Sequence, residues 1–376
     1  MPSVAIVRDF RAEGWPSMDL CADQLLAHWP PGAGVEDVAT PFRRRVGRVP
    51  FAGGTGFNAD RLLNRHVFLP RIVRLAAGRS DFVHIVDHSY AHLTRAVPPG
   101  RAGVYCHDLD AFRSLLEPAA EPRPVWFRRL AARTLDGLKR AAVVFHSPAE
   151  IRDRIVRYKL VDAERLVHAP YGVSAEFAPL ATGIESPTVV PRPYLLHVGS
   201  NIPRKRLDVL LDVFAVVREE RPELKLVQVG GPWPAPLAQR IDRLGIGSAV
   251  TQLLGLTRPQ LAELYRGAAA VLIPSDAEGF GLPVIEALAC GATVIASDLA
   301  VLREVGGNAC AYAPVGDVRA WATLVQSCLR RVISDADRIA RSDSVRSYTW
   351  SNHAAIIASA YRNLACSGPL TTGFKK

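Results

Sequence analysis

Long hydrophobic runs are missing from this chain. No uninterrupted apolar stretch among its 376 residues approaches the length of a membrane-spanning helix, which is about 20 residues. The six cysteines show no Cys-x-x-Cys spacing, a pattern that favours reduced, mostly buried thiols over a disulfide framework. The start of the chain, Met1 to Phe10, is typical of a strand and unlike a signal peptide. We therefore expect a cytoplasmic protein.

Lysine is also scarce, with only six lysines among 46 basic residues, although the net charge is +10. Residues 1–185 carry 25 basic and 20 acidic side chains, and the remaining residues carry 21 and 16. The excess is therefore spread evenly and lacks the concentrated patch of a nucleic-acid-binding protein. We expect no nucleic-acid partner, and the charge favours phosphorylated substrates or anionic lipid instead.

Short apolar runs alternate with helical patterns along the whole chain, as in parallel sheets with crossover helices. The length suits two such α/β domains. The expected strands are Ser3–Val7, Asp81–Val86, Gly103–Cys106, Ala142–Phe145, Leu166–Ala169, Tyr194–Val198, Lys225–Val229, Val250–Leu254, Ala269–Ile273, Ala292–Ala296 and Ala309–Ala313. Between the two halves, residues 177–193 contain four prolines and one glycine. Such a composition suits a linker better than a helix or a central strand.

The segment 273–286 combines a strand end, a glycine loop and a helix start. Pro283 suits the first turn of a helix. The glycines on either side of Phe280 let the backbone approach a ligand, and free amides at a helix start favour an anion. The carboxylates of Glu278 and Glu286 could accept hydrogen bonds from hydroxyl groups at opposite ends of one extended ligand. This pattern indicates a site for a diphosphate that joins a sugar to a ribose.

Two glutamates with seven residues between them, around Gly-Phe-Gly-Leu-Pro, resemble the signature of glycosyltransferase family four. The resemblance is strongest from Tyr194 to Asp317. It implies the GT-B fold, in which two doubly wound, Rossmann-like α/β domains face a central cleft. It also implies that the chain is a retaining enzyme that moves a hexose of the mannose or glucose type from a nucleoside diphosphate sugar to a hydroxyl acceptor. The family-level expectation is surface polysaccharide or glycan assembly, with no metal and no cofactor beyond the donor substrate.

Four segments are expected in a chain of this family. Residues 1–180 form the acceptor-side domain, and residues 181–193 form the linker. Residues 194–348 form the domain that binds the nucleotide sugar. Residues 349–376 form a terminal helix that, in the resembled family, crosses back to the first domain.

A second anion-binding turn follows the expected strand Tyr194–Val198. In the resembled family, an arginine just after the glycine of this turn and a lysine several residues later hold the diphosphate. Lys205 falls on the lysine position, whereas Ser200 falls on the arginine position, and Arg204 is the candidate replacement. Glu278 is expected to orient the sugar hydroxyls and Glu286 the ribose. The full expected donor site comprises Ser200, Arg204, Lys205, Gly230, Glu278, Gly279, Phe280, Gly281, Leu282 and Glu286.

The segment after Gly103–Cys106 resembles the family's His-Asp segment near the reacting sugar. By this resemblance His107 hydrogen-bonds a sugar hydroxyl, and its backbone carbonyl stabilises positive charge on the anomeric carbon. The expected catalytic residues are His107, Glu278 and Lys205. The expected acceptor-side residues are Gly14, His88, Tyr90 and Asp108.

Two apparent metal motifs are better explained without a metal. Asp108-Leu-Asp110 spells the Asp-x-Asp sequence that holds a divalent metal in the unrelated GT-A glycosyltransferases, but Asp110 can cap the helix that follows. His84, His88 and His92 have the spacing of a helical zinc site, but a strand at the first of them breaks that register. No metal site is expected.

Simpler explanations stay open for other features. Glu286 alone could complement a helix dipole, and Glu278 alone could be a solvated loop charge. The basic, amphipathic segment 124–140 could contact an anionic membrane at its inner face, or it could pack with Trp126, Leu130 and Leu138 turned inward. The whole chain could also be a catalytically idle GT-B protein that binds a nucleotide sugar or scaffolds a glycan-assembly complex.

Overall fold

The computed structural model describes residues 1–46, 53–179 and 190–366. Residues 181–189 of the expected linker lie outside this part, as do residues 367–376 of the expected terminal segment.

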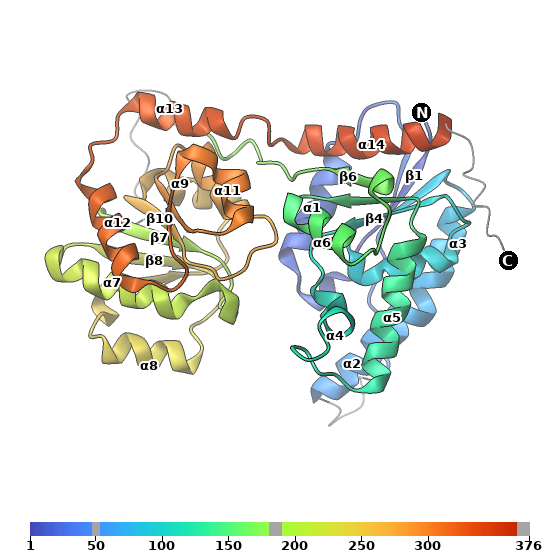
Figure 1. Ribbon diagram of the computed structural model, residues 1–376, viewed down its shortest axis with the longest axis horizontal. Helices are drawn as coiled ribbons and strands as arrows, with labels where there is room; N and C mark the ends of the chain where they lie inside the picture. Colours follow the sequence, from blue (N-terminus) through green and yellow to red (C-terminus); the bar gives the residue numbers. More distant parts are fainter. Residues whose placement is uncertain (47–52, 180–189, 367–376) are drawn as a thin grey trace. The chain divides into compact units, whose positions relative to one another are not determined.

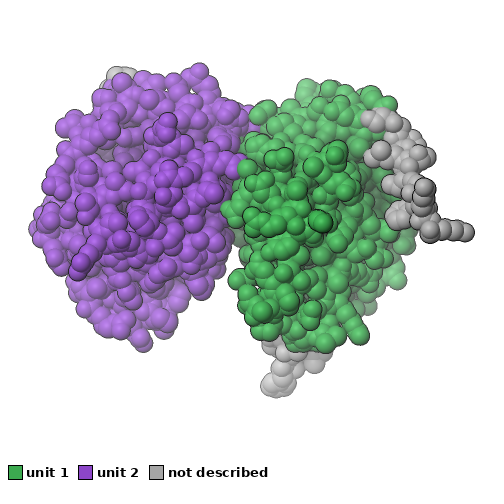
Figure 2. All heavy atoms as spheres, in the orientation of Figure 1, with its two compact units in different colours: residues 1–172, 350–376 green, residues 173–349 purple. Residues whose placement is uncertain are grey.

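The chain forms two compact units (Figure 2), and each has its own hydrophobic core. Unit 1 comprises Met1–Gly172 and Trp350–Lys376, and unit 2 comprises Val173–Thr349. Each unit contains one parallel six-stranded sheet. The residues just after Gly172 belong to unit 2 because Arg266 of that unit donates a hydrogen bond to the carbonyl oxygen of Glu176 at 2.7 Å.

The sheet of unit 1 has the strand order β2-β1-β3-β4-β5-β6 (Figure 1). Its strands are β1 (Val4–Val7), β2 (Val35–Val38), β3 (Phe82–Ile85), β4 (Ala102–Cys106), β5 (Val143–His146) and β6 (Leu166–His168). The helices are α1 (Pro16–Ala27), α2 (Gly53–Leu63), α3 (Leu69–Ala77), α4 (Arg113–Leu116), α5 (Val125–Arg140), α6 (Ala149–Arg157) and α14 (Trp350–Cys366). Shorter helical segments are η1 (Arg11–Glu13), η3 (Asn64–Phe68), η4 (His88–Ala96), η5 (Asp110–Phe112) and η6 (Ala163–Arg165). Every residue of β1, β3, β4 and β5 is buried, as expected where helices cover both faces of a parallel sheet.

Helix α14 is part of unit 1 although it ends the described chain. The side chain of Tyr361 is fully buried, and its hydroxyl lies 2.9 Å from Nδ1 of His84 on β3. His353 of the same helix lies 3.1 Å from the carbonyl oxygen of Ala169, directly after β6. A segment distant in sequence therefore completes the core of this unit.

Strand β2 is absent from the strands expected from sequence. It is an edge strand with the sequence Val-Glu-Asp-Val, and only Val38 is buried. A strand that is mostly exposed carries no apolar run, so the pattern that indicates the other strands is missing here.

The sheet of unit 2 has the strand order β12-β11-β10-β7-β8-β9. Its strands are β7 (Tyr194–Val198), β8 (Lys225–Val229), β9 (Val250–Leu253), β10 (Ala270–Ile273), β11 (Val294–Ser297) and β12 (Cys310–Ala313). The helices are α7 (Leu207–Glu220), α8 (Ala235–Arg243), α9 (Arg258–Gly267), α10 (Leu282–Ala289), α11 (Ala300–Gly306), α12 (Val318–Arg330) and α13 (Asp335–Ser344). Shorter segments are η7 (Pro203–Lys205), η8 (Gly247–Ala249) and η9 (Gly307–Ala309).

Alternate residues of the unit 2 strands face different helices. Leu195 and Leu226 pack in one cluster with Phe214 of α7 and Trp321 of α12. Leu196, the next residue along β7, is also buried but lies outside that cluster. Both faces of the sheet are therefore covered, which makes it doubly wound. Because all strands of a sheet run parallel, the loops that leave their carboxyl ends gather at one edge, where ligands bind in folds of this class.

Helix α5 differs from expectation at its start. Leu138 is fully buried against the core of unit 1, as expected. Trp126 is not turned inward: 59% of its surface is exposed, and 64% of that of Val125. The inward face of α5 therefore begins later in the helix, and its first turn presents apolar side chains to solvent.

Candidate functional site

The loop between β10 and α10 carries the glycine motif of unit 2. Gly281 adopts the left-handed conformation with φ of 98°, and no side chain caps the helix start. A Cβ atom at this position would lie 2.9 Å from Cδ2 of Leu302. Glycine is therefore required by both conformation and space. The uncapped amino end of α10 is a favourable place for an anion.

Glu278, in the same loop, is held by cations from a different strand connection. Lys205, at the end of η7, donates to Oε1 of Glu278 at 2.6 Å, and Arg204 donates to Oε2 at 3.1 Å. Ser275 also donates to Oε1 at 2.6 Å. Only 5% of the Glu278 side chain and 10% of the Lys205 side chain are exposed. The structure thus brings together three of the expected donor-site residues.

The charges of this cluster do not cancel. Burial raises the pKa of Glu278, but Lys205 and Arg204 outweigh that effect and hold the pKa below its ordinary value. The carboxylate is therefore ionised at neutral pH and offsets only one of the two cations. Arg204 remains 40% exposed. The remaining positive charge lies at the carboxyl edge of the sheet, where it can bind an anion.

The turn after β7 is fixed by three amide side chains. Gln228 on β8 donates to the carbonyl oxygen of Gly199 at 3.0 Å, and Asn201 donates to that of Gly231 at 2.6 Å. Gln252 on β9 donates to Oε1 of Gln228 at 2.9 Å. This network has a structural role, and sequence reasoning missed it because its members come from two strands and a turn that are far apart in the sequence.

Gly230 and Ser200 belong to the same region. A Cβ atom at Gly230 would lie 2.1 Å from the carbonyl oxygen of Gly199, so packing of the turn already requires a glycine there. Ser200 is exposed beside it and carries no charge. A direct contact of either residue with a ligand stays a prediction.

His197 on β7 is a second residue that sequence reasoning missed. Its Nδ1 lies 2.9 Å from the carbonyl oxygen of Leu272, while its buried Nε2 has no partner among the described residues. Burial lowers the pKa of His197 to about 4, so the ring is neutral. The signal in the sequence that could have revealed His197 is a polar residue within an otherwise apolar strand.

Glu286 lies one turn into α10 and is buried, with 8% of its surface exposed. The hydroxyl of Tyr265 donates to Oε2 at 3.2 Å, and Nη2 of Arg258 lies 3.9 Å from Oε1. Burial raises the pKa of Glu286 to about 7, against the opposing effects of Arg258 and Tyr265. Arg258 in turn packs over the ring of Phe177 at 5.1 Å. The expected contact between Glu286 and a ribose stays a prediction.

Three residues around Gly281 complete the expected donor set. Phe280 is buried and makes an edge contact with Tyr348 at 5.8 Å between ring centroids. Leu282 is the first residue of α10, and Gly279 precedes Phe280 in the loop. The motif therefore lies where its pattern predicts, between a buried strand and a helix.

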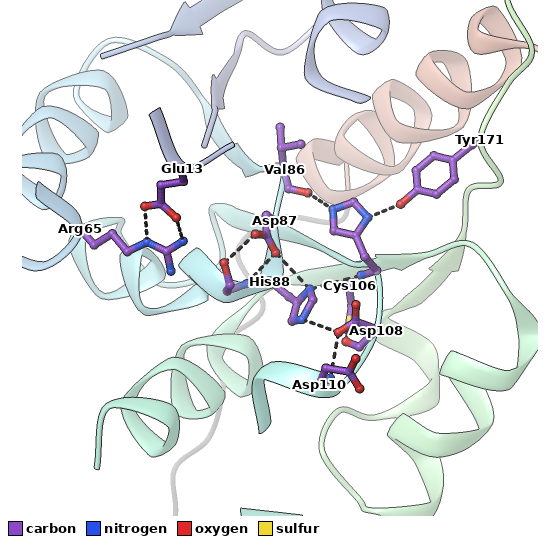
Figure 3. A network of polar contacts seen from close by, with 11 residues as sticks. Glu13, Arg65, Val86, Asp87, His88, Cys106, Asp108, Asp110 and Tyr171 are labelled. Atoms are coloured by element: carbon purple, nitrogen blue, oxygen red, sulfur yellow. Dashed lines mark hydrogen bonds and ion pairs between the residues drawn. The ribbon is translucent and has the colours of Figure 1, made fainter. Parts of the chain in front are cut away.

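In unit 1, His88 lies between two carboxylates at the same kind of sheet edge (Figure 3). Its Nδ1 is 3.2 Å from Oδ1 of Asp87, and its Nε2 is 3.2 Å from Oδ1 of Asp108. Burial lowers the pKa of His88, but the carboxylates outweigh burial and raise it above the ordinary value. Asp108 is 40% exposed, so this chain of charges ends at a carboxylate that solvent can reach.

His107, the expected catalytic histidine, has a partner on each ring nitrogen. Its Nε2 lies 2.7 Å from the carbonyl oxygen of Val86, and its Nδ1 contacts the hydroxyl of Tyr171 (Figure 3). The ring also stacks on Tyr105 at 4.7 Å. Burial lowers the pKa of His107, so the ring is neutral at neutral pH. His107 was expected to hydrogen-bond a sugar hydroxyl through its ring and to stabilise positive charge through its backbone carbonyl. Only the second of these roles needs no change in the contacts of the ring.

Tyr90 and Gly14 flank a buried ion cluster. Glu13, with 1% of its side chain exposed, pairs with Arg65 and lies 3.0 Å from Nε of Arg61. The hydroxyl of Tyr90 donates to Glu13 at 2.8 Å. Gly14 ends η1 in the left-handed conformation with φ of 74°. The acceptor-side roles of Gly14 and Tyr90 stay predictions.

Asp9 and Asp87 form a carboxylate pair that sequence reasoning missed. Val7 pairs with Ile85 in the sheet, so the residues two places beyond each emerge side by side. Burial raises the pKa of Asp9 well above its ordinary value, and Asp87 adds to that effect. An aspartate two residues after the end of each buried strand was the available signal.

The described residues contain no group of three or more histidine, cysteine or acidic side chains arranged to hold a metal ion. In the expected Asp-x-Asp segment, the backbone amide of Asp110 donates to Oδ1 of Asp108 at 2.8 Å. Among the helices of the described part, none combines the length and the apolarity needed to cross a membrane.

Comparisons with known sequences give a consistent result. Residues 185–341 match the family model of the glycosyl transferases group 1. A D-inositol 3-phosphate glycosyltransferase of Thermobispora bispora is 30% identical over 244 residues, which are 56% of each chain. The O-antigen chain mannosyltransferase B of Escherichia coli is 26% identical over 70% of this chain and 71% of its own. The chain spans about half the length of the inositol phosphate relatives, 56% in Thermobispora bispora and 45% in Jonesia denitrificans.

Solved structures agree on the fold. The sucrose-phosphate synthase of Thermosynechococcus elongatus superposes with a TM-score of 0.70 over 98% of this chain and 100% of its own, at 18% identity. Anabaena HepE in complex with UDP and glucose gives 0.71 over 96% of this chain and 100% of its own, at 16% identity. These likenesses, together with two doubly wound parallel sheets, confirm the expected GT-B fold.

Proposed function

We propose that the chain, whose residues 185–341 match the model of the glycosyl transferases group 1, is a member of that family and transfers a hexose from a nucleoside diphosphate sugar to a hydroxyl acceptor. A donor of the mannose or glucose type is supported by a mannosyltransferase relative and by a fold neighbour whose complex holds UDP and glucose. The single observation that carries the proposal is the cluster of Lys205, Arg204 and Glu278 beside the uncapped start of α10.

In this proposal the diphosphate binds between the cations and the helix start. Two cations and one buried carboxylate leave positive charge for the anion, and the amides of residues 279–282 add donors that need no rearrangement. Such preorganised donors stabilise the charge that develops on the leaving diphosphate. Glu278 orients the sugar hydroxyls, and Glu286 the ribose.

We further propose a retaining reaction without a metal. The bond from the anomeric carbon to the donor phosphate breaks on the same face at which the acceptor oxygen attacks, and the leaving phosphate oxygen takes the acceptor proton. Lys205 and Arg204 meet the charge of the leaving group, which is the role that a metal fills in other transferases. His107 contributes its backbone carbonyl, because both of its ring nitrogens are engaged.

The acceptor side is proposed at the sheet edge of unit 1. Asp108 is partly exposed and paired with His88, so it can accept a hydrogen bond from an acceptor hydroxyl. The relatives include an O-antigen mannosyltransferase, which supports a role in surface polysaccharide or glycan assembly. Lipid-linked, glycan and small hydroxyl acceptors are all compatible with such a carboxylate.

We also propose that the protein is cytoplasmic and that the start of α5 touches the inner face of a membrane. Val125 and Trp126 are exposed beside the exposed cations Arg128 and Arg129. Apolar side chains next to cations favour an anionic lipid surface. Co-sedimentation with anionic vesicles, compared between the wild type and Trp126→Ser, tests this contact: equal sedimentation would contradict it.

The proposed function is tested with a panel of nucleoside diphosphate sugars. One donor is expected to raise the thermal unfolding temperature and to be hydrolysed slowly or transferred to an added acceptor. Glu278→Ala is expected to abolish turnover while the fold persists. The matched control is Glu219→Ala, which changes an exposed glutamate near the end of α7.

The outcomes separate the enzyme from its rival. Binding of one donor with no turnover in the presence of any acceptor would favour a catalytically idle protein that binds a nucleotide sugar or scaffolds an assembly. Two observations are behind that rival: Ser200 supplies no cation at the turn, and the loop after the first strand has Gly14 as its only glycine. No response to any donor would contradict both.

A further inference from the structure

Unit 2 contains a cavity away from the donor loops. Its volume is about 470 Å³, within the range of small-molecule sites. Val294 and Cys310, the first residues of β11 and β12, are paired in the sheet and line it. Because these residues begin their strands, the cavity lies at the amino end of the sheet, opposite the edge that carries Lys205 and Glu278. Cys328 of α12 and residues of α13 form other walls.

The cavity contains a cation that has no ion-pair partner in the described part of the chain. Arg331 pairs with Asp337, with 2.5 Å between Nη2 and Oδ1, and Ser334 occupies the other oxygen of Asp337 at 2.7 Å from its hydroxyl. Arg341 is half-buried and donates to the carbonyl oxygen of Gly291 at 3.2 Å. Within the described ranges it forms no ion pair. The lining therefore holds two cations and one carboxylate, whose two oxygens are both engaged.

The remaining walls do not balance this charge. Burial raises the pKa of the Cys310 thiol to about 12 and also raises that of Cys328, so both stay neutral thiols at neutral pH. Burial also lowers the pKa of Arg341, as expected for a guanidinium that lacks a full counter-charge. Val294 and Ile333 supply apolar surface.

We propose that this cavity is a second binding site, for a small organic anion whose charged group pairs with Arg341 and whose apolar part lies against Val294 and Ile333. A carboxylate or phosphate suits the planar fork of an arginine. An apolar body suits the strand starts and the connection that follows α12. The site is separate from the donor site, and it does not depend on the proposed transferase activity.

Hexanoate is the probe, because it combines one carboxylate with a short apolar chain, and hexanamide is its neutral counterpart. Isothermal titration and thermal unfolding of the full chain are measured for both, with chloride keeping the ionic strength constant. Hexanoate is expected to bind and stabilise the wild type. Arg341→Gln is expected to weaken this binding about tenfold or more. The matched control Arg330→Gln, an exposed cation of α12, leaves it unchanged.

A second variant and a local measurement keep the test independent of folding. Ala340→Asp places a carboxylate in the lining beside Arg341, so it too is expected to abolish hexanoate binding. Hexanoate should also slow alkylation of Cys328 by iodoacetamide in proportion to its occupancy, but not alkylation of the exposed Cys366. The proposal is overturned if hexanamide binds as tightly as hexanoate, if either cavity variant retains full affinity, or if the wild type binds neither probe.

Discussion

Replacement of Lys205 by methionine tests the electrostatic cluster most directly. The change keeps most of the side-chain length and removes the ammonium, so Glu278 loses a partner at 2.6 Å while 95% of its side chain stays out of solvent. Loss of one partner of a buried pair typically costs about 3–5 kcal/mol. Arg204 and Ser275 still bond the carboxylate, so we expect the lower end, about 3 kcal/mol.

The assay must report on unit 2 alone, because two units need not unfold together. We would follow hydrogen exchange of peptides from β7 and β10 during urea unfolding at pH 7. Arg240→Met is the matched control, since the pair of Arg240 with Asp212 is about one-third exposed and should contribute at most about 1 kcal/mol. Lys205→Met combined with Glu278→Gln should be more stable than the sum of the single changes predicts, because no buried charge is then left unpaired and Arg204, which also loses its carboxylate, is 40% exposed.

The pH dependence gives a sign that can be checked. The pKa of Glu278 is lower in the folded protein than its ordinary value of 4.5, so its contribution is fully present above pH 4.5 and is lost as the pH falls through the folded pKa. The difference between wild type and Lys205→Met should therefore shrink below pH 4.5. A loss no larger than that of the Arg240 control, or one that is constant down to pH 3, would refute the reasoning.

Three further predictions concern other buried groups. The folded pKa of Glu286 is raised from 4.5 to about 7, so the stability of the wild type falls as the pH rises between these values. In Glu286→Gln the decrease in the free energy of unfolding between pH 4.5 and pH 8 should be smaller by about 3 kcal/mol. An unchanged pH profile of urea unfolding would count against this prediction. Gly230→Ala, which meets the carbonyl of Gly199 at 2.1 Å, should lower stability by roughly 2–4 kcal/mol, whereas Gly247→Ala, with 3.7 Å of room, should have little effect on the same measurement. Tyr171→Phe leaves Nδ1 of His107 without its hydroxyl partner and should cost about 1–3 kcal/mol in unit 1, which a neutral result in hydrogen exchange of β4 would disprove.

Sequence patterns predicted most of the sheet strands for a simple reason. A strand covered on both faces must be largely apolar, so β4 and β10 appear as short apolar runs, and β7 does so apart from His197. Strand β2 escapes this rule because it lies at an edge with most of its residues exposed. Boundaries set by a few hydrogen bonds, such as the one just after Gly172, have no comparable pattern.

The candidate site also has one part that the sequence predicts and another that only the tertiary structure shows. The loop with Glu278 and Gly281 is local, and its glycine conformation follows from neighbouring residues, so the sequence alone indicated an anion site there. The partners of Glu278 come from a turn more than seventy residues earlier, and their contact exists only because β7 and β10 are neighbours in the sheet.

The sequence by itself determined the α/β class, the glycine motif and the types of residue that could bind an anion. These features depend on local periodicity and backbone conformation. The tertiary structure decided which charges are buried, which are paired and which are left over. It engages both nitrogens of His107, sets Asp9 beside Asp87 and, among the residues that the structure describes, leaves Arg341 without a carboxylate. Such outcomes depend on distances between segments far apart in the chain and on the exclusion of water around them, and neither quantity is encoded in a local pattern.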